Sequence, residues 1–323
     1  MWAVVAFLSV VVATWLAGIS WFAWLAAFHD GLPVVLVGAW IALVYGAVTR
    51  QWLLAAGGGV LVLFHLAITV PRMFSATVPD WVAGAPRITL AAANVFVGNR
   101  TPDASAAGLV ATNADVLVVS ERNDAFMHSL AARDDAGDYA HHLDEVSDTP
   151  DYATSIAARI SLLDGSEVVY TGSMAIVRAV VACGDQRLQI LGVHLRALTT
   201  PNGFGVWRTE LNELEVFLQG VRHPYVVVGD FNATQFLPAF ARFLRVVRLR
   251  PAHDAVGKGL TGSLKPAAHG LLGRFPALGR VDHALCSTAV FPVRVENRHA
   301  AGSDHRPFVV TLAVNPAAVM DHA

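Results

Sequence analysis

The chain has 323 residues, with 23 basic and 25 acidic side chains and a formal net charge of −2. A chain with nearly equal numbers of basic and acidic side chains has no general attraction to polyanions, which argues against a protein whose main task is to hold long nucleic acid. This charge balance does not exclude an enzyme that cuts nucleic acid. Two cysteines, Cys183 and Cys286, are too few for a disulfide framework, and both lie in apolar strand-like runs where a buried free thiol is the commoner state.

Charge is almost absent from the first 71 residues, where Asp30 and Arg50 are the only charged side chains. Three uncharged apolar runs fill this segment: residues 2–27, 32–48 and 51–70. Each run is long enough to cross a hydrocarbon core of about 30 Å, so we expect a membrane anchor of three transmembrane helices. A cleaved signal peptide would explain the first run alone, and buried helices of a soluble domain would need a polar face that is missing here.

The orientation of this anchor rests on few charges. By the positive-inside rule, Arg50 between the second and third runs is cytoplasmic and Asp30 between the first two is external. Everything after residue 70 would then lie outside the cytoplasmic membrane. Arg72, just past the third run, falls on the same outer side and argues against this orientation.

The polar part of the chain begins after the third run. Pro79 and Gly84 are typical of a linker, which we place at residues 72–86. A folded domain over residues 87–315 and a short tail, residues 316–323, complete the predicted organisation.

Beyond the linker, apolar strand-like runs repeatedly end on polar residues. These residues are Asn94, Glu121, His194, Asp230 and Asp282. Helical stretches separate the runs, over residues 104–112, 205–218 and 236–247. The alternation predicts an α/β domain in which helices cover two sheets, with a site along the polar rim.

The segment Tyr225–Thr234, YVVVGDFNAT, is the clearest of these strand ends. Its apolar residues suit a strand covered on both faces, and Gly229 lets the backbone turn so that Asp230 and Asn232 stay close together. A carboxylate and an amide at a sheet edge suit a phosphate with its metal ion. On these residues alone, an ordinary turn is the alternative, because Gly, Asp and Asn are common turn formers.

The last element, GSDHRPFVV over residues 302–310, completes an ordered set of motifs. Together they resemble the endonuclease/exonuclease/phosphatase superfamily, which includes DNase-like nucleases, inositol-phosphate phosphatases and neutral sphingomyelinases. GDFN followed by SDHRP is a specific pair, and the resemblance spans residues 88–314. It implies phosphoester hydrolysis in a four-layered αββα sandwich of the DNase I type, here preceded by three transmembrane helices.

The resemblance also implies a role for individual residues. It assigns a metal ion to Asn94, Glu121 and Asp304, and catalysis to His194, Asp230, Asn232, Asp282 and His305. Oxygen ligands favour a hard cation, so the implied cofactor is Mg²⁺ or Mn²⁺. In this assignment Asp282 orients His305, and Asp230 aligns and activates a water molecule. His194 and Asn232 would donate to the non-bridging phosphate oxygens.

The anchor adds information about the substrate. Three spans followed by such a domain resemble the membrane-bound VanJ-like proteins linked to teicoplanin resistance, which are thought to act outside the membrane on polyprenyl diphosphate carriers. This resemblance implies a hydrolase of a lipid-linked phosphate or diphosphate, with the lipid bilayer as its partner. The loop over residues 264–278 fits a headgroup layer, because it mixes apolar and basic side chains: Leu271, Leu272, Phe275, Lys265, His269 and Arg274. A loop packed over the sheet end is the alternative.

Other functions remain open at this point. A metal-dependent surface endonuclease or exonuclease would use the same site on nucleic acid, and a sphingomyelinase-type phosphodiesterase would use it on a phospholipid. A membrane scaffold with a decayed site is disfavoured, because every motif residue is present.

Overall fold

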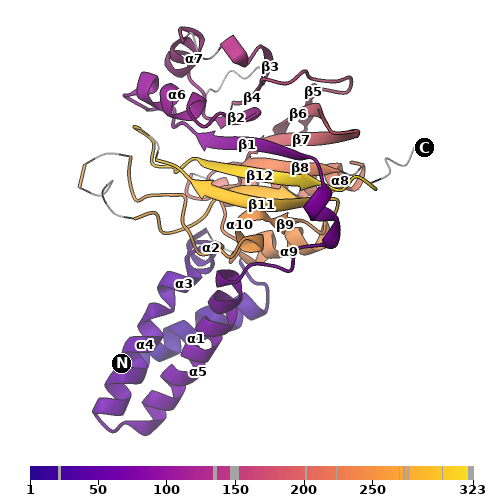
Figure 1. Ribbon diagram of the computed structural model, residues 1–323. Helices are drawn as coiled ribbons and strands as arrows, with labels where there is room; N and C mark the ends of the chain where they lie inside the picture. Colours follow the sequence, from indigo (N-terminus) through magenta and orange to yellow (C-terminus); the bar gives the residue numbers. More distant parts are fainter. Residues whose placement is uncertain are drawn as a thin grey trace.

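The computed structural model describes residues 1–20, 23–133, 137–145, 153–200, 202–222, 224–268, 270–271, 274, 276–299 and 301–318. Two parts stand out in Figure 1: a two-sheet sandwich, and a bundle of apolar helices that projects from it. We call the bundle, residues 2–73, the helical extension. Three of the six side chains on which the headgroup loop was predicted, His269, Leu272 and Phe275, lie outside the described residues.

The first sheet has six strands in the order β11-β12-β1-β2-β4-β3. Their bounds are β1 Arg87–Asn94, β2 Val116–Ser120, β3 His141–Asp144, β4 Thr154–Ala158, β11 Val290–Asn297 and β12 Phe308–Val314. β1 and β2 pair in parallel, whereas β12 runs antiparallel to β1. All five residues of β2 are buried, as expected of a strand covered on both faces.

The second sheet also has six strands, in the order β5-β6-β7-β8-β10-β9. Their bounds are β5 Glu167–Thr171, β6 Met174–Cys183, β7 Gln186–His194, β8 Tyr225–Asp230, β9 Arg250–Pro251 and β10 Asp282–Cys286. β7 and β8 pair in parallel, with His194 opposite Asp230. β10 runs antiparallel to β8, with Asp282 also opposite Asp230.

Helices cover the outer face of each sheet. The domain helices are α6 Pro102–Val110, α7 Asp124–Ala131, α8 Gly203–Gln219, α9 Pro238–Val246 and the short α10 Ala252–Ala255. Leu109 of α6 and Phe126 of α7 pack on the first sheet, and Trp207 of α8 and Phe240 of α9 pack on the second. A third apolar layer lies between the sheets, where Val118 of one is buried with residues such as Val228 of the other. The predicted four-layered α/β sandwich is therefore confirmed.

The helical extension differs from the prediction of three transmembrane helices. It contains α1 Trp2–Leu16, α2 Ala23–Asp30, α3 Leu32–Val35, α4 Val37–Val48, α5 Trp52–Thr69 and the 3₁₀ turn η1 Val70–Met73. Among the described residues, one helix, Trp52–Met73 with 22 residues, is long and apolar enough to cross a membrane. The segments Ala23–Asp30 and Leu32–Val48 form a second span only if a pair bent by 78° is counted as one.

Breaks in the apolar runs explain this correction. α1 has 15 residues, about 22 Å at 1.5 Å per residue, which is shorter than the hydrocarbon core. It ends just before Gly18, whose φ of 70° is left-handed and ends a helix readily. Gly31 separates α2 from α3 at the bend. Hydropathy sums apolar residues along a run and does not register where the backbone turns.

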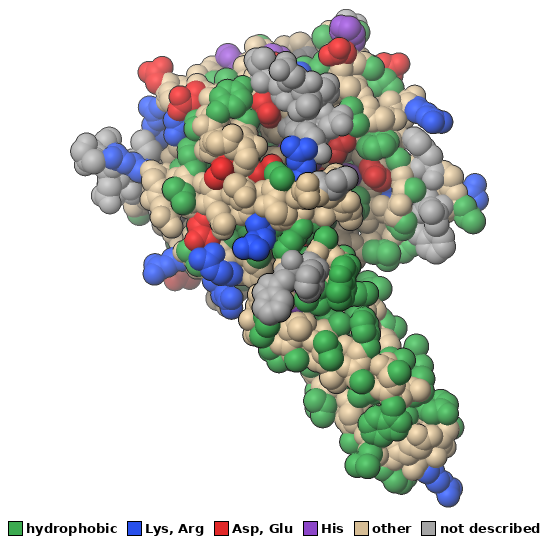
Figure 2. Space-filling view, turned by 180° about the vertical axis from the view of Figure 1, so that it is seen from behind, with side chains coloured by type: hydrophobic (Ala, Val, Ile, Leu, Met, Phe, Trp, Pro, Cys, Tyr) green, Lys and Arg blue, Asp and Glu red, His purple; other side chains and the backbone are tan. Residues whose placement is uncertain are grey.

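The outer surface of the extension is apolar, as the green side chains of Figure 2 show. Val48, Leu53 and Leu63 are 77%, 79% and 68% exposed. Large apolar side chains on a projecting element are unusual for a surface that faces water. Residues between the extension and β1, including the 3₁₀ turn η2 Asp80–Gly84, run along the sandwich, where Val82 packs with Phe291.

One smaller prediction is also confirmed. Cys183 and Cys286 are free and buried, as expected. Phe240 and Phe243 of α9 are fully buried in the core beneath the second sheet.

Candidate active site

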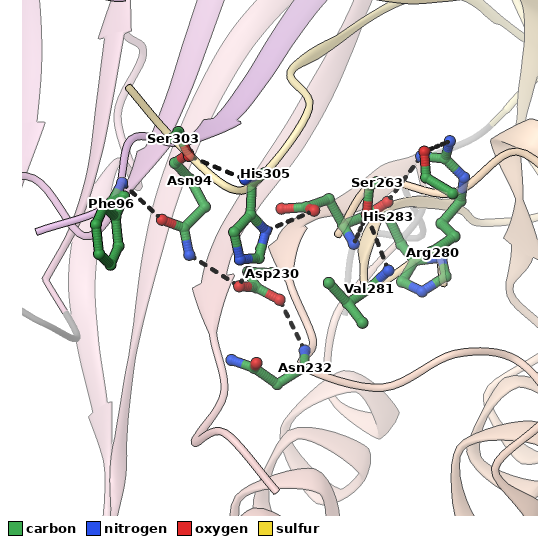
Figure 3. A network of polar contacts seen from close by, with 12 residues as sticks. Asn94, Phe96, Asp230, Asn232, Ser263, Arg280, Val281, His283, Ser303 and His305 are labelled. Atoms are coloured by element: carbon green, nitrogen blue, oxygen red, sulfur yellow. Dashed lines mark hydrogen bonds and ion pairs between the residues drawn. The ribbon is translucent and has the colours of Figure 1, made fainter. Parts of the chain in front are cut away.

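Polar ends of strands from both sheets meet at one edge of the sandwich. Asn94 ends β1, and its side-chain Nδ2 donates to Glu121 Oε1 at 2.7 Å and to Asp230 Oδ2 at 2.9 Å. The Phe96 N–H donates to Asn94 Oδ1 at 3.0 Å, so the amide nitrogen faces the carboxylates; Figure 3 shows its contact with Asp230. Asn94 therefore joins a carboxylate beside the first sheet to one at the end of the second.

Glu121 follows β2 directly and sits in a left-handed backbone conformation, with φ of 54°. Its Oε2 accepts the Val97 N–H at 3.0 Å, which holds this conformation in place. Burial raises the pKa of Glu121, while the hydrogen bonds from Asn94 and Val97 lower it in part. A carboxylate in this position gains stability from a nearby cation.

The turn after β8 is shaped by Gly229 and Asn232. A Cβ on Gly229 would lie 1.9 Å from the carbonyl oxygen of Val193, so no larger residue fits beside β7. Asp230 Oδ1 accepts the Asn232 N–H at 2.8 Å, and Asn232 Nδ2 donates to the Leu195 carbonyl at 2.8 Å. Burial, with a contribution from the charge of Asp282, raises the pKa of Asp230 to about 6 against the opposing effect of His305.

His305 and Asp282 form a close pair. His305 Nδ1 lies 2.8 Å from Asp282 Oδ2 and 3.7 Å from Asp230 Oδ2. Burial alone would lower the pKa of His305, but the charges of Asp282 and Asp230 outweigh it, so the net shift is upward. Burial alone would raise the pKa of Asp282, but His305 outweighs it and the net shift is downward. The pair is therefore a charged imidazolium held by a carboxylate at neutral pH.

His194 faces the same cluster from the end of β7. Its Nε2 lies 3.8 Å from Glu121 Oε1 and 3.7 Å from Asp230 Oδ2, and 3.4 Å from Asn232 Nδ2. Burial lowers the pKa of His194 despite the charge of Asp230. A neutral imidazole at neutral pH can donate one hydrogen bond to a phosphate oxygen.

Two serines that were missed in the sequence hold this constellation in place. Ser303 Oγ donates to the Asn94 carbonyl at 2.9 Å and accepts the His305 N–H at 3.0 Å. Ser263 Oγ accepts the N–H groups of Val281 and Asp282 at 3.0 and 3.1 Å. Ser303 could have been found from its place beside the Asp-His motif, whereas Ser263 lies 19 residues before Asp282 and carries no local signal.

A comparison of the sequence with models of protein families identifies the family of this chain. The model of the Endonuclease/Exonuclease/phosphatase family matches residues 53–305. This chain belongs to that family. Members of the endonuclease/exonuclease/phosphatase family are phosphoester hydrolases and generally use a divalent metal ion.

Solved structures share the fold at low sequence identity. D. rerio TDP2, complexed with a single-strand DNA product, is 17% identical, with a TM-score of 0.57 over 71% of this chain and 99% of that one. Sphingomyelinase C from Streptomyces griseocarneus is 16% identical, with a TM-score of 0.53 over 70% and 99%. An endonuclease/exonuclease/phosphatase from Beutenbergia cavernae is 17% identical, with a TM-score of 0.53 over 72% of each chain. No curated protein matches the chain, and the finer resemblance to VanJ-like proteins stays a prediction.

A divalent ion, as other endonuclease/exonuclease/phosphatase proteins use, fits the donor atoms at this edge. Two groups bring ligand atoms within 4.8 Å of one another: Glu121, His194 and Asp230, and Asp230, Asp282 and His305. Asp304 lies outside both groups, but its Oδ1 is buried without a hydrogen-bond partner among the described residues. A buried carboxylate oxygen of this kind is a natural ligand for a hard cation.

The three predicted metal ligands therefore differ in how well their positions suit a metal ion. Glu121 belongs to a cluster with metal-ligand geometry. Asn94 presents N–H groups to carboxylates here, and its oxygen is taken by Phe96. The five residues predicted for catalysis all reach the same edge: His194, Asp230, Asn232, Asp282 and His305.

Proposed function

We propose that the chain is a membrane-anchored, Mg²⁺-dependent phosphoester hydrolase that acts on a lipid-linked phosphate or diphosphate, such as a polyprenyl diphosphate. The observation that carries this proposal is the direct contact between the apolar extension and the catalytic turn. Asp30, at the end of α2, accepts the N–H of Thr234, which lies two residues after Asn232. A site joined in this way to a membrane segment meets lipid headgroups at high effective concentration.

Close packing within the extension supports its insertion into a bilayer. α4 and α5 form a hairpin in which a Cβ on Gly46 would lie 2.6 Å from the backbone nitrogen of Ala55. Backbone contact through small residues is typical of helices packed in membranes. The exposed faces of the same hairpin carry Val44 and Val60, which are 58% and 68% exposed.

The placement of the two arginines supports a catalytic domain outside the cytoplasm. Arg50 lies in the turn between α4 and α5, at the tip of the extension farthest from the sandwich (Figure 1). Arg72, which argued against this orientation in the sequence, pairs with Asp254 of the domain at 3.8 Å. Because Asp254 balances the charge of Arg72, the orientation that the positive-inside rule predicts depends mainly on Arg50.

The residues at the edge divide the work of hydrolysis. A bound Mg²⁺ supplies positive charge that offsets the charge of the phosphate. Asp230, whose raised pKa of about 6 still leaves it ionised above that pH, is placed to accept a proton from the attacking water. His305, held charged by Asp282, faces the phosphate oxygens with its other ring nitrogen. Asn232 and His194 donate to the remaining oxygens.

Purified full-length protein in lipid nanodiscs tests this function. With Mg²⁺ it is given polyprenyl diphosphate, sphingomyelin or single-stranded DNA, and released phosphate or cleaved product is measured. We expect turnover of the polyprenyl substrate that EDTA abolishes. Asp230→Asn and His305→Ala should each slow it by about 10²-fold or more. Asp185→Asn and His128→Ala, at exposed positions elsewhere on the domain, are the matched controls.

The substrate that is hydrolysed decides between the candidate functions. Turnover of sphingomyelin alone would make the chain a lipid phosphodiesterase. Cleavage of DNA alone, lost in His305→Ala, would make it a nuclease and would refute the lipid substrate. A reporter enzyme that works only in the cytoplasm can be fused after residue 70. Activity of this fusion would overturn the proposed orientation.

A further inference from the structure

The helical extension and the catalytic turn are joined by hydrogen bonds and by apolar packing. Thr234 donates its N–H to Asp30 Oδ1 at 2.5 Å and its hydroxyl to the Asp30 carbonyl at 2.6 Å. Trp15 Nε1 donates to the Phe236 carbonyl at 2.6 Å. The Phe236 side chain is buried among apolar residues of the extension, such as Leu36. The segment that follows Asn232 is therefore packed into the extension.

A cavity of about 310 Å³ lies at this junction. One wall comes from α2 to α4, around Pro33 and Val37, and a second comes from Thr69 at the end of α5. The third wall belongs to the catalytic domain, where residues 234–236 and 278–280 line the space. The cavity is thus shared by the proposed membrane segment and the domain that carries the site.

The domain wall of this cavity is adjacent to three site residues. Thr234 follows Asn232 by two residues, and Arg280 precedes Asp282 by two. Two residues span at most about 7 Å. Gly279, between them on the wall, pairs with Leu264, and Leu264 pairs in turn with His305. A phosphate at the site and a chain in the cavity therefore lie within the reach of one molecule.

Most polar groups on the cavity wall already have partners. Asp30 and Thr234 bind each other. Arg280 donates to Thr261 Oγ1 at 2.9 Å and Asn297 Oδ1 at 3.1 Å, and Gln235 Nε2 donates to the Gly259 carbonyl at 3.1 Å. Thr69 Oγ1 donates to the His65 carbonyl at 2.7 Å, and His65 Nδ1 accepts the Trp40 indole N–H at 3.2 Å. Arg280 Nε is buried without a hydrogen-bond partner among the described residues. The remaining surface that a guest can contact is mostly apolar. Side chains at the mouth are apolar and exposed, with Val34 and Val37 each at 51% and Leu278 at 58%.

We propose that this junction cavity binds the hydrocarbon chain of a membrane lipid, at the part of the chain nearest to the phosphate held in the catalytic site. The inference rests on the proposed function and extends it, because it places the lipid portion of the substrate. A largely apolar lining, exposed apolar side chains from α3 and from the loop at Leu278, and a wall that leads to the catalytic turn favour a hydrocarbon chain over a polar ligand. The cavity then selects substrates by chain, while the site acts on the phosphate.

Chain-length dependence tests this assignment. In nanodiscs, n-alkyl phosphonates of four to twelve carbons compete against hydrolysis of the soluble ester bis(p-nitrophenyl) phosphate. Each buried methylene is worth about fourfold in affinity, so inhibition should strengthen several-fold per added carbon until the cavity is filled. Val37→Trp, which fills the cavity from α4, should weaken inhibition by the longer phosphonates at least tenfold and leave hydrolysis of the soluble ester unchanged.

The control is Val44→Trp on the same helix. Val44 lies seven residues beyond Val37, hence on the same face, is 58% exposed, and does not line the cavity. It reports how far chain length acts through partition into the bilayer. Equal inhibition profiles for Val37→Trp and Val44→Trp, with soluble hydrolysis intact, would overturn the lipid cavity and leave the hydrolase standing. Absence of any metal-dependent phosphoester hydrolysis would overturn the proposed function and the inference with it.

Discussion

The bridge made by Asn94 permits a sharp test of the electrostatics at the site. Its Nδ2 donates to Glu121 at 2.7 Å and to Asp230 at 2.9 Å. Asn94→Ala removes both hydrogen bonds, and since a bond to a charged group is worth about 1.5 to 3 kcal/mol, the folded protein should lose roughly 3 to 6 kcal/mol in the absence of metal. Asn94→Asp removes the same bonds and adds a third carboxylate at hydrogen-bond distance from two others. It should therefore destabilise the fold more than Asn94→Ala.

Thermal unfolding with and without Mg²⁺ measures these effects. In EDTA we expect the unfolding temperature to fall in the order wild type, Asn94→Ala, Asn94→Asp. Mg²⁺ should raise it most for Asn94→Asp, because the cation neutralises the carboxylate that causes the loss. Asn212→Asp, on the exposed face of α8, is the matched control for an added charge. An Asn94→Asp variant that is as stable as Asn94→Ala in EDTA, or that gains no more from Mg²⁺ than wild type, would refute this reasoning.

Three further predictions concern other parts of the domain. Asp282→Asn removes the charge that holds His305 and should lower kcat for a soluble phosphodiester by about 10²-fold or more. It should also lower the unfolding temperature, because a buried hydrogen bond between charged groups is worth about 1.5 to 3 kcal/mol. Gly229→Ala should prevent folding, because its Cβ would lie 1.9 Å from the Val193 carbonyl oxygen, and the yield of monodisperse protein measures this. Burial raises the pKa of Glu210 from 4.5 to about 7, so its contribution to stability is full below pH 4.5 and is lost as the pH rises through 7. Glu210→Gln should flatten the fall in unfolding temperature between those pH values.

Controls for these three predictions come from the same elements or residue types. Asp185→Asn should keep kcat within twofold, and a similar value for Asp282→Asn would remove the role of the His305 pair. Gly205→Ala in α8 has no atom within 4 Å of the new Cβ and should stabilise the helix slightly, by up to about 1 kcal/mol. If Gly229→Ala folded equally well, the close contact with β7 would not exist. An unchanged pH profile in Glu210→Gln would show that this carboxyl is ionised in the folded protein at low pH.

Much of the site could be predicted from the sequence because a change from apolar to polar residues marks the end of a buried strand. β8 buries all six of its residues, and a change from valines to Asp230 marks where the strand reaches the polar edge of the sandwich. The same local signal placed His194 and Asp282, whereas His305 was assigned by the resemblance of the GSDHRPFVV motif to the superfamily. The order of the motifs implied that these residues meet. The separation of Asn94 from Asp230 by 136 residues along the chain hides the hydrogen bond between them, since nothing local encodes it.

For the helical extension, in contrast to the site, the sequence predicted the composition but not the arrangement of the helices. An apolar composition was evident from the near absence of charge over 71 residues. The bend of 78° at Gly31 and the end of α1 before Gly18 were not, because hydropathy carries no information on helix direction. The contact of Asp30 with Thr234 could not be foreseen either, since it joins residues 204 positions apart.

The sequence by itself predicted two sheets of apolar strands with polar ends, behind an apolar extension. The resemblance of its ordered motifs to a known superfamily implied the four-layered sandwich and the phosphoester chemistry. Burial periodicity and strand termini are local properties, and they survive without coordinates. Tertiary structure alone decided that Asn94 ties Glu121 to Asp230 and that a cavity opens beside the catalytic turn. It also showed that one buried oxygen of Asp304 has no hydrogen-bond partner within the described part of the chain. Those features depend on distances across the two sheets and the junction, and such distances arise only when distant segments pack.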